Sequence, residues 1–154
     1  VLGPDAAPGT PEFDAYVKQL LVEMTTKAGQ KCTAIRRAIV PAAAVDAVVA
    51  ALGEKIAERV VIGDPRAEGV TMGPVVSRAQ RDEVGRQVRA LQDAGGRLLL
   101  GSLEDPEVVH ADGSVGPAPE GAFVAPILVG FEDATAPAVH EIEAFGPVAS
   151  VLPY

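Results

Sequence analysis

The hydrophobic pattern begins with one long amphipathic stretch. From Pro11 to about Lys27 the apolar residues return at spacings of three and four, which is the period of a helix with one buried face. Thr10 is placed to cap the first turn, with Pro11 as the first helical residue. Gly29 is a natural stop. The pattern therefore predicts a helix that ends just before a short polar turn.

Two further helices follow from the same period. Val45–Glu58 carries its apolar residues on one side, and a third helix is expected to begin after Ser77 and to stop at Gly95. Gln80 stands three residues after Ser77, as in a capping box, where each side chain bonds the other residue's backbone N–H. Residues 137–142 are expected to form one more helical turn.

Short apolar runs between these helices predict strands. Three are expected, at Ala38–Val40, Arg97–Leu100 and Val148–Leu152. A fourth run, residues 123–131, is interrupted by Pro126, which predicts a strand, a kink and a second strand. Residues 101–121 are polar and rich in Gly and Pro, so they are expected to form a surface loop. Helices that alternate with short strands favour an α/β fold, with helices packed on a largely parallel sheet.

The composition is that of an ordinary globular protein and excludes some partners. The chain has 154 residues, 48% hydrophobic and 22% charged, with a formal net charge of −8. This length can bury the core of one domain. An acidic chain lacks the basic surface that nucleic acids require, and no apolar run reaches the roughly 20 residues of a membrane span. The single cysteine has no partner for an intrachain disulfide, which favours a reducing, cytoplasmic compartment.

Both ends of the sequence predict that it is part of a longer chain. It begins without an initiator Met, in a stretch rich in Pro and Gly, and it stops at Tyr154 within an apolar run that is typical of a strand. An unpaired strand edge at that place would favour association with another chain.

Cys32 is the most informative candidate for chemistry. It lies in the polar turn between a helix and a strand, where a side chain can be exposed. Cysteine reacts as the thiolate, which positive charge favours, and four cations stand within five residues of it: Lys27, Lys31, Arg36 and Arg37. From composition alone, a single cysteine is more often a small buried residue. His110 and His140 lie too far along the chain to be assigned as its base, and no second ligand stands at a metal-site spacing from them.

Four segments in order resemble those of the aldehyde dehydrogenase superfamily. Its nucleophile motif Gly-Gln-x-Cys matches Gly29–Cys32, and its Gly-Asp-Pro and Gly-Pro-apolar-apolar-Ser pair matches Gly63–Pro65 and Gly73–Ser77. Gly121–Pro126 fits a strand that precedes the last motif, Glu-x-Phe-Gly-Pro-Val, which matches Glu143–Val148. Any one motif is weak, but four in order over nearly the whole chain identify it as a member of this superfamily.

A narrower similarity is to the PaaZ-type bifunctional subfamily of phenylacetate degradation, which joins an aldehyde dehydrogenase to a hydratase domain. It is carried by the segments Thr25–Arg37 and Ala136–His140. The subfamily implies a CoA-linked semialdehyde as the substrate, oxidised to the acid with NADP. The superfamily implies a homo-oligomer for the full-length protein.

The resemblance also implies a fold and roles for individual residues. Residues 1–154 would form the three-layer catalytic domain of an aldehyde dehydrogenase, with most of the cofactor-binding domain lying outside them. Cys32 would add to the aldehyde, and the thiohemiacetal would pass hydride to NADP or NAD, leaving a thioester that water hydrolyses. Glu143 would hold the nicotinamide ribose, and Phe145 would pack near the nicotinamide. Without the motif, Glu143 would be interpreted as a solvated charge.

The sequence departs from the family pattern in one respect and leaves alternatives open. The family's general-base glutamate, asparagine oxyanion donor and glycine-rich phosphate loop have no match here, so these residues alone are predicted to have no dehydrogenase activity. One alternative is a CoA-acylating dehydrogenase or thiol acyltransferase, in which the Cys32 thioester passes to CoA. Another is a non-catalytic assembly domain in which Cys32 is buried. Arg36 or Arg37 would suit a CoA phosphate, but a solvated position at the edge of a strand is the simpler interpretation.

Overall fold

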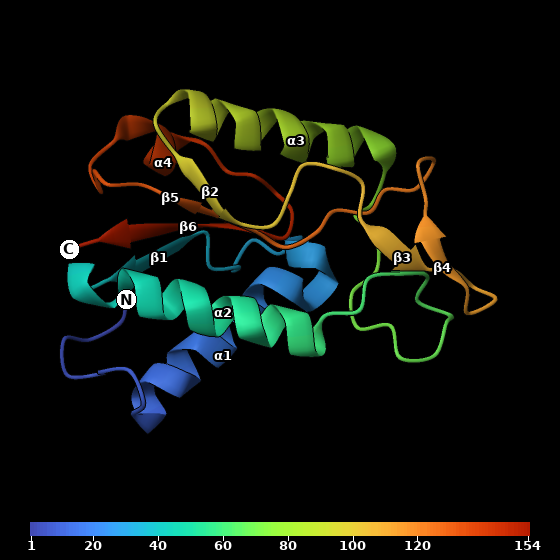
Figure 1. Ribbon diagram of the computed structural model, residues 1–154. Coiled ribbons are helices and arrows are strands. Elements are labelled where there is room, and N and C mark those ends of the chain that lie inside the picture. Colours follow the sequence, from blue (N-terminus) through green and yellow to red (C-terminus); the bar gives the residue numbers. More distant parts are fainter.

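The main sheet and the helices form three layers in a computed structural model that describes residues 1–154 (Figure 1). The central layer is a four-stranded sheet of order β1-β6-β5-β2. Its strands are β1 (Arg37–Val40), β2 (Arg97–Leu100), β5 (Ile127–Gly130) and β6 (Val148–Pro153). β6 pairs in parallel with both β1 and β5, and β2 pairs antiparallel with β5. The expected α/β fold with a largely parallel sheet is confirmed, with one antiparallel strand at an edge.

Helices cover both faces of this sheet. α1 (Pro11–Thr25) and α2 (Val45–Arg59) lie on one face, and α3 (Arg78–Asp93) and the short α4 (Pro137–Glu141) lie on the other (Figure 1). β5 alternates between the two cores, since Leu128 belongs to the cluster under α1 and α2 while Ile127 and Val129 belong to the cluster under α3. Because both faces are covered, every residue of β5 is buried. None of the helices is long and apolar enough to span a membrane.

The first helix begins as expected but ends early. The Thr10 hydroxyl oxygen accepts a hydrogen bond from the Phe13 backbone N–H at 3.3 Å, and Pro11 occupies the first turn. The helix ends at Thr25, because Lys27 and Ala28 have left-handed backbone, with φ of 54° and 50°. The chain continues in a tight turn, η1 (Thr26–Gly29), so the helix predicted to about Lys27 was two residues too long.

The capping box expected at the start of α3 is only half formed. The Ser77 hydroxyl oxygen accepts from the Gln80 backbone N–H at 3.1 Å, which is the cap that the sequence predicts. The Gln80 side chain does not return to Ser77. Its Nε2 donates instead to the carbonyl oxygen of Phe145 at 2.9 Å. α2, α4 and the short η2 turn (Ala42–Ala44) complete the helical elements, and α2 and α4 lie within one residue of their expected bounds.

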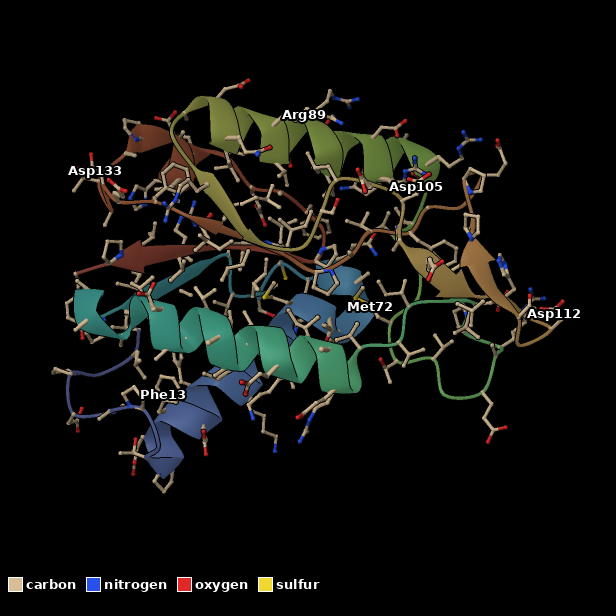
Figure 2. All side chains as sticks on the ribbon, in the orientation of Figure 1. Phe13, Met72, Arg89, Asp105, Asp112 and Asp133 are labelled. Carbon is tan, nitrogen blue, oxygen red and sulfur yellow. The ribbon has the colours of Figure 1, made fainter.

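The surface loop expected over residues 101–121 contains a small hairpin. Its strands are β3 (Glu107–Val109) and β4 (Val115–Pro117), which pair antiparallel. The Asp112 side chain closes the turn by accepting from the Ser114 backbone N–H at 3.0 Å, and the hydrogen bonds from Ser114 lower the pKa of Asp112. Figure 2 shows Asp112 at the outer tip of this hairpin, far from Asp133. The Gly- and Pro-rich composition indicated the turns but concealed the three-residue strands between them.

The kinked pair of strands expected over residues 123–131 is a single strand. Only Ile127–Gly130 pairs with its neighbours, and the segment before it is irregular. Pro126 has no N–H to donate to an adjacent strand, so β5 begins directly after it. This expectation was wrong in its first half.

Candidate active site

Cys32 lies in the exposed turn between η1 and β1. The turn is held by the side chain of Gln30, whose Nε2 donates to the carbonyl oxygen of Lys27 at 3.0 Å and whose Oε1 accepts from the backbone N–H of Val76 at 2.8 Å. The second bond ties the cysteine turn to the segment that contains Gly73–Ser77. The exposure expected for Cys32 is confirmed, and the expectation that its side chain is buried is wrong, while an assembly role stays untested.

Topology brings the cysteine turn to the segment Glu143–Gly146. Cys32 precedes β1 and the Glu143–Gly146 segment precedes β6, and these two strands are parallel neighbours. Segments that lead into adjacent parallel strands meet at the same end of a sheet. The contact is close, because a Cβ at Gly29 would lie only 2.0 Å from the carbonyl oxygen of Gly146. Any residue larger than glycine at position 29 would force the two segments apart.

Glu143 and Phe145 are the exposed side chains of this second segment. The Glu143 side chain is 54% exposed, and Phe145 is 37% exposed although it is a large apolar residue. The backbone of Phe145 is fixed by the bond from Gln80. An accessible carboxylate accepts hydrogen bonds from hydroxyl groups, and an accessible aromatic ring packs against a flat ring. Both side chains are thus accessible to a ligand, and their expected roles toward the ribose and the nicotinamide stay predictions.

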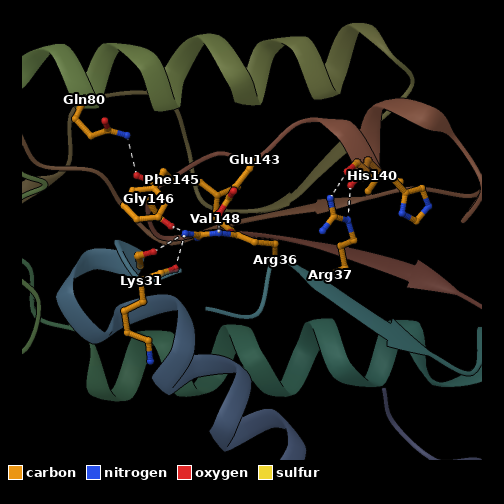
Figure 3. A network of polar contacts seen from close by, with 11 residues as sticks. Lys31, Arg36, Arg37, Gln80, His140, Glu143, Phe145, Gly146 and Val148 are labelled. Atoms are coloured by element: carbon orange, nitrogen blue, oxygen red, sulfur yellow. Dashed lines mark hydrogen bonds and ion pairs between the residues drawn. The ribbon is translucent and has the colours of Figure 1, made fainter. Parts of the chain in front are cut away.

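Arg36 joins the two segments, which the sequence did not predict. Its side chain is only 10% exposed, and its guanidinium donates to the carbonyl oxygens of Gly29 and Gly146 at 2.7 Å each (Figure 3). Its Nε lies 3.4 Å from Oε1 of Glu143. Burial lowers the pKa of Arg36, and the carboxylate of Glu143 opposes that shift. The expectation that this arginine is solvated was wrong, since the only sequence signal was a charge next to an apolar run.

Two of the other three cations near Cys32 also have partners. Arg37 donates through Nε to the carbonyl oxygen of Val139 at 2.7 Å and through Nη2 to that of His140 at 2.5 Å, and it remains partly exposed at the start of the edge strand β1. Lys31 forms an ion pair with Glu23 at 2.9 Å. Three of the four cations counted in the sequence are thus engaged by other groups, and they bind the turn to the surrounding elements.

The thiol of Cys32 has no hydrogen-bonded base in this chain. Neither histidine bonds to it, and a ring nitrogen of His140 instead lies 2.8 Å from the carbonyl oxygen of Ala134. The backbone N–H of Cys32 also has no acceptor within the chain. No group of three or more His, Cys, Asp or Glu side chains is placed to hold a metal ion. The arrangement thus offers an exposed thiol, a free backbone donor beside it and an accessible carboxylate and ring across a glycine contact.

Comparison with known proteins assigns the chain to a family and finds the same fold in solved structures. The chain matches the model of the aldehyde dehydrogenase family over residues 9–154. It is 44% identical over 155 residues to a 3,4-dehydroadipyl-CoA semialdehyde dehydrogenase of Aromatoleum evansii. A mutant aldehyde dehydrogenase from Bacillus cereus is similar in structure, with a TM-score of 0.75 and 27% identity. A betaine aldehyde dehydrogenase from Staphylococcus aureus, in complex with NAD+, has a TM-score of 0.75 and 25% identity.

The coverage of these matches is unequal. The alignment to the semialdehyde dehydrogenase includes 100% of this chain but 29% of that relative. The two solved structures cover 94% and 92% of this chain, which in turn spans 26% of each. The chain therefore corresponds to under a third of the length of these relatives.

Proposed function

The chain belongs to the aldehyde dehydrogenase family, and from this we propose that residues 1–154 are the thiol-bearing catalytic part of an NAD(P)-dependent enzyme that oxidises an aldehyde to an acid. The observation that carries the proposal is the glycine contact between the turn of Cys32 and the segment of Glu143 and Phe145. It brings an exposed thiol to a pair of side chains suited to a nicotinamide nucleotide.

The proposed reaction begins at Cys32. Its thiolate adds to the carbonyl carbon of the aldehyde and forms a C–S bond, while the carbonyl electron pair moves to oxygen. A donor is needed where this negative charge develops. The backbone N–H of Cys32 is free to be that donor, because it bonds to no other group in the chain.

The second step is removal of hydride from the tetrahedral carbon. Bound NAD or NADP supplies the hydride acceptor. Glu143 would hold the ribose hydroxyls of the nucleotide and Phe145 would pack beside its nicotinamide, since both side chains are exposed next to the turn of Cys32. The thioester that remains is hydrolysed by water, which releases the acid and restores the thiol. A base must activate this water, and we assign it to the complete enzyme because the family's general-base glutamate motif has no match in this sequence.

The proposed substrate is a CoA-linked semialdehyde of phenylacetate catabolism. The support for it is the similarity to a 3,4-dehydroadipyl-CoA semialdehyde dehydrogenase, which extends over the whole of this chain. We place the complete enzyme in the cytoplasm, since an exposed thiol that must stay reduced suits a reducing compartment. We also propose that it is a homo-oligomer, as the family resemblance implies. Transfer of the thioester to CoA is the competing reaction, because the same thiol and oxyanion donor would serve it.

The test uses the complete enzyme with Cys32→Ala and with Thr33→Ala as the matched control. Thr33 is an exposed neighbour of Cys32 in the same turn. Loss of the nucleophile is expected to lower kcat by about 1000-fold or more, while Thr33→Ala stays near wild type. Free acid as the product would support hydrolysis of the thioester. Acyl-CoA as the product would instead support transfer of the acyl group to CoA. Full activity of Cys32→Ala would contradict the proposal.

A further inference from the structure

One side chain contacts both segments of the proposed active site. The guanidinium of Arg36 is directed at four backbone carbonyl oxygens, those of Gly29, Lys31, Gly146 and Val148 (Figure 3). Gly29 ends η1 and Lys31 lies in the turn of Cys32, while Gly146 precedes β6 and Val148 is its first residue. The bonds to Gly29 and Gly146 are short, at 2.7 Å each. These are the two glycines whose backbones are in contact.

The carbonyl oxygens of Gly29 and Gly146 use both of their lone pairs. Gly29 accepts from the backbone N–H of Lys31 at 2.9 Å, and Gly146 accepts from that of Val148 at 2.8 Å. Arg36 supplies the second donor to each. A guanidinium carries five N–H donors in a rigid planar fork, so it can serve two oxygens on opposite sides. The compact ammonium of a lysine lacks this fork.

The base of the Arg36 side chain is fixed to the sheet. Its carbonyl oxygen accepts from the backbone N–H of Ser150 on β6 at 2.7 Å, and β1 begins at the next residue. The side chain is only 10% exposed. The anchored backbone and the low exposure restrict the positions that the guanidinium can take, and thereby the positions of the two segments that it contacts.

The same guanidinium also contacts both side chains assigned to the nucleotide. Its Nε lies 3.4 Å from Oε1 of Glu143, and its central carbon lies 5.3 Å from the ring centroid of Phe145, within the range of a cation–π contact. The Glu143 side chain is still 54% exposed. Arg36 thus restrains the carboxylate without covering it.

We infer that Arg36 is a positioning residue, which fixes Glu143 and Phe145 relative to the turn of Cys32 and so sets both the affinity for the nicotinamide nucleotide and the rate of hydride transfer. The inference rests on the proposed function. Arg36 acts through the backbone and side chains that it holds. Without it, the two glycine carbonyl oxygens would each lose one donor and Glu143 would lose its restraint.

The test compares Arg36→Met and Arg36→Lys with Arg37→Met in the complete enzyme. Arg37 is the matched control, because it also donates to two backbone carbonyl oxygens, those of Val139 and His140, but it contacts neither segment of the site. Arg36→Met is expected to raise KM for the nucleotide about tenfold and to lower kcat by up to about 100-fold, the order of effect of a 1 Å misplacement. Arg36→Lys is expected to recover little of either loss, since it restores the charge without the fork.

Stability and thiol exposure are measured on the same variants. Arg36→Met and Arg37→Met are expected to lower Tm, while iodoacetamide still labels Cys32 in the folded proteins. Equal changes in KM and kcat in the Arg36 and Arg37 variants, or no change in the Arg36 variants, would overturn the inference and leave the proposed function standing. If Arg36→Met does not fold, the KM and kcat of Arg36→Lys are compared with those of Arg37→Met in the same way, and that comparison decides the inference. Failure of the proposed function is recognised separately, by activity that persists in Cys32→Ala.

Discussion

Three consecutive residues before the cysteine turn, Lys27, Ala28 and Gly29, have left-handed backbone, with φ of 54°, 50° and 70°. For residues other than glycine this conformation costs roughly 1–2 kcal/mol each. Ala28 is only 3% exposed and packs in the core under α3, which offsets its strain. Lys27 is exposed and has no such compensation. The strain at Lys27 is therefore a local cost of placing Cys32.

Replacement of Lys27 by glycine is expected to stabilise the chain. The substitution removes the clash of Cβ but gives the unfolded chain more freedom, so the free energy of unfolding should rise by about 0.5 kcal/mol. The control is Lys18→Gly, at an exposed position inside α1, which should lower it by about 1 kcal/mol. Denaturation by urea measures both. A Lys27→Gly variant as unstable as Lys18→Gly would show that the left-handed backbone is not strained.

Single residues show which local features could be predicted from the sequence and which could not. Gly29 identified a stop, because glycine tolerates a conformation that other residues avoid. The conformation of Lys27 and Ala28 could not be predicted, since it is imposed by the core and by the contact of Gly29 with Gly146. Arg36 was missed for a similar reason. Its partners are backbone oxygens up to 112 residues away, and backbone groups leave no trace in side-chain patterns.

At the scale of elements, the start of α3 supports the segment that contains Phe145. Ser77 caps the helix, and Gln80, which the sequence assigned to the same cap, donates to the carbonyl oxygen of Phe145 instead. Helix-capping rules are local, so they located the start of the helix correctly. The partner of Gln80 is 65 residues away, which only the packing of α3 beside that segment determines.

This assignment predicts different effects for two neighbouring substitutions. Ser77→Ala should lower the free energy of unfolding by about 1 kcal/mol through the loss of the cap, with little effect on residues 143–148. Gln80→Ala should leave the cap in place and speed amide hydrogen exchange across residues 143–148, since it removes the bond to Phe145. Exchange measured by mass spectrometry on both variants distinguishes them. If Gln80→Ala acted only on the first turn of α3, Gln80 would be a capping residue after all.

At the scale of the whole molecule, the sheet order brings the two segments of the proposed active site together. The alternation of helices and strands predicted the layers, but pairing of β1 with β6 joins segments more than 100 residues apart, and no local pattern encodes it. The family motifs at Gly29–Cys32 and Glu143–Val148 indicated that these segments belong to one site. Only the structure shows that they touch through Gly29 and Gly146 and through Arg36.

Residues 1–154 by themselves are expected to be inactive. The thiol of Cys32 has no hydrogen-bonded base in the chain, and the family's general-base motif has no match in the sequence, so we expect neither deprotonation of the thiol nor attack of water on a thioester to be assisted. The measurement mixes the chain with an aldehyde and NAD or NADP, and monitors reduction of the nucleotide by its absorbance. Reduction that is lost on Cys32→Ala would contradict this expectation and would mean that the chain supplies its own base.

The most direct test of the central claim is to trap the acyl group on Cys32. The complete enzyme is mixed with NADP and aldehyde, quenched in acid within one turnover, digested and examined by mass spectrometry. We predict a thioester on the peptide that contains Cys32, with the mass of the acyl group added, present in wild type and in Thr33→Ala and absent without the nucleotide. An enzyme that turns over while this peptide stays unmodified, or that carries the acyl group on another residue, would contradict the assignment of Cys32 as the nucleophile.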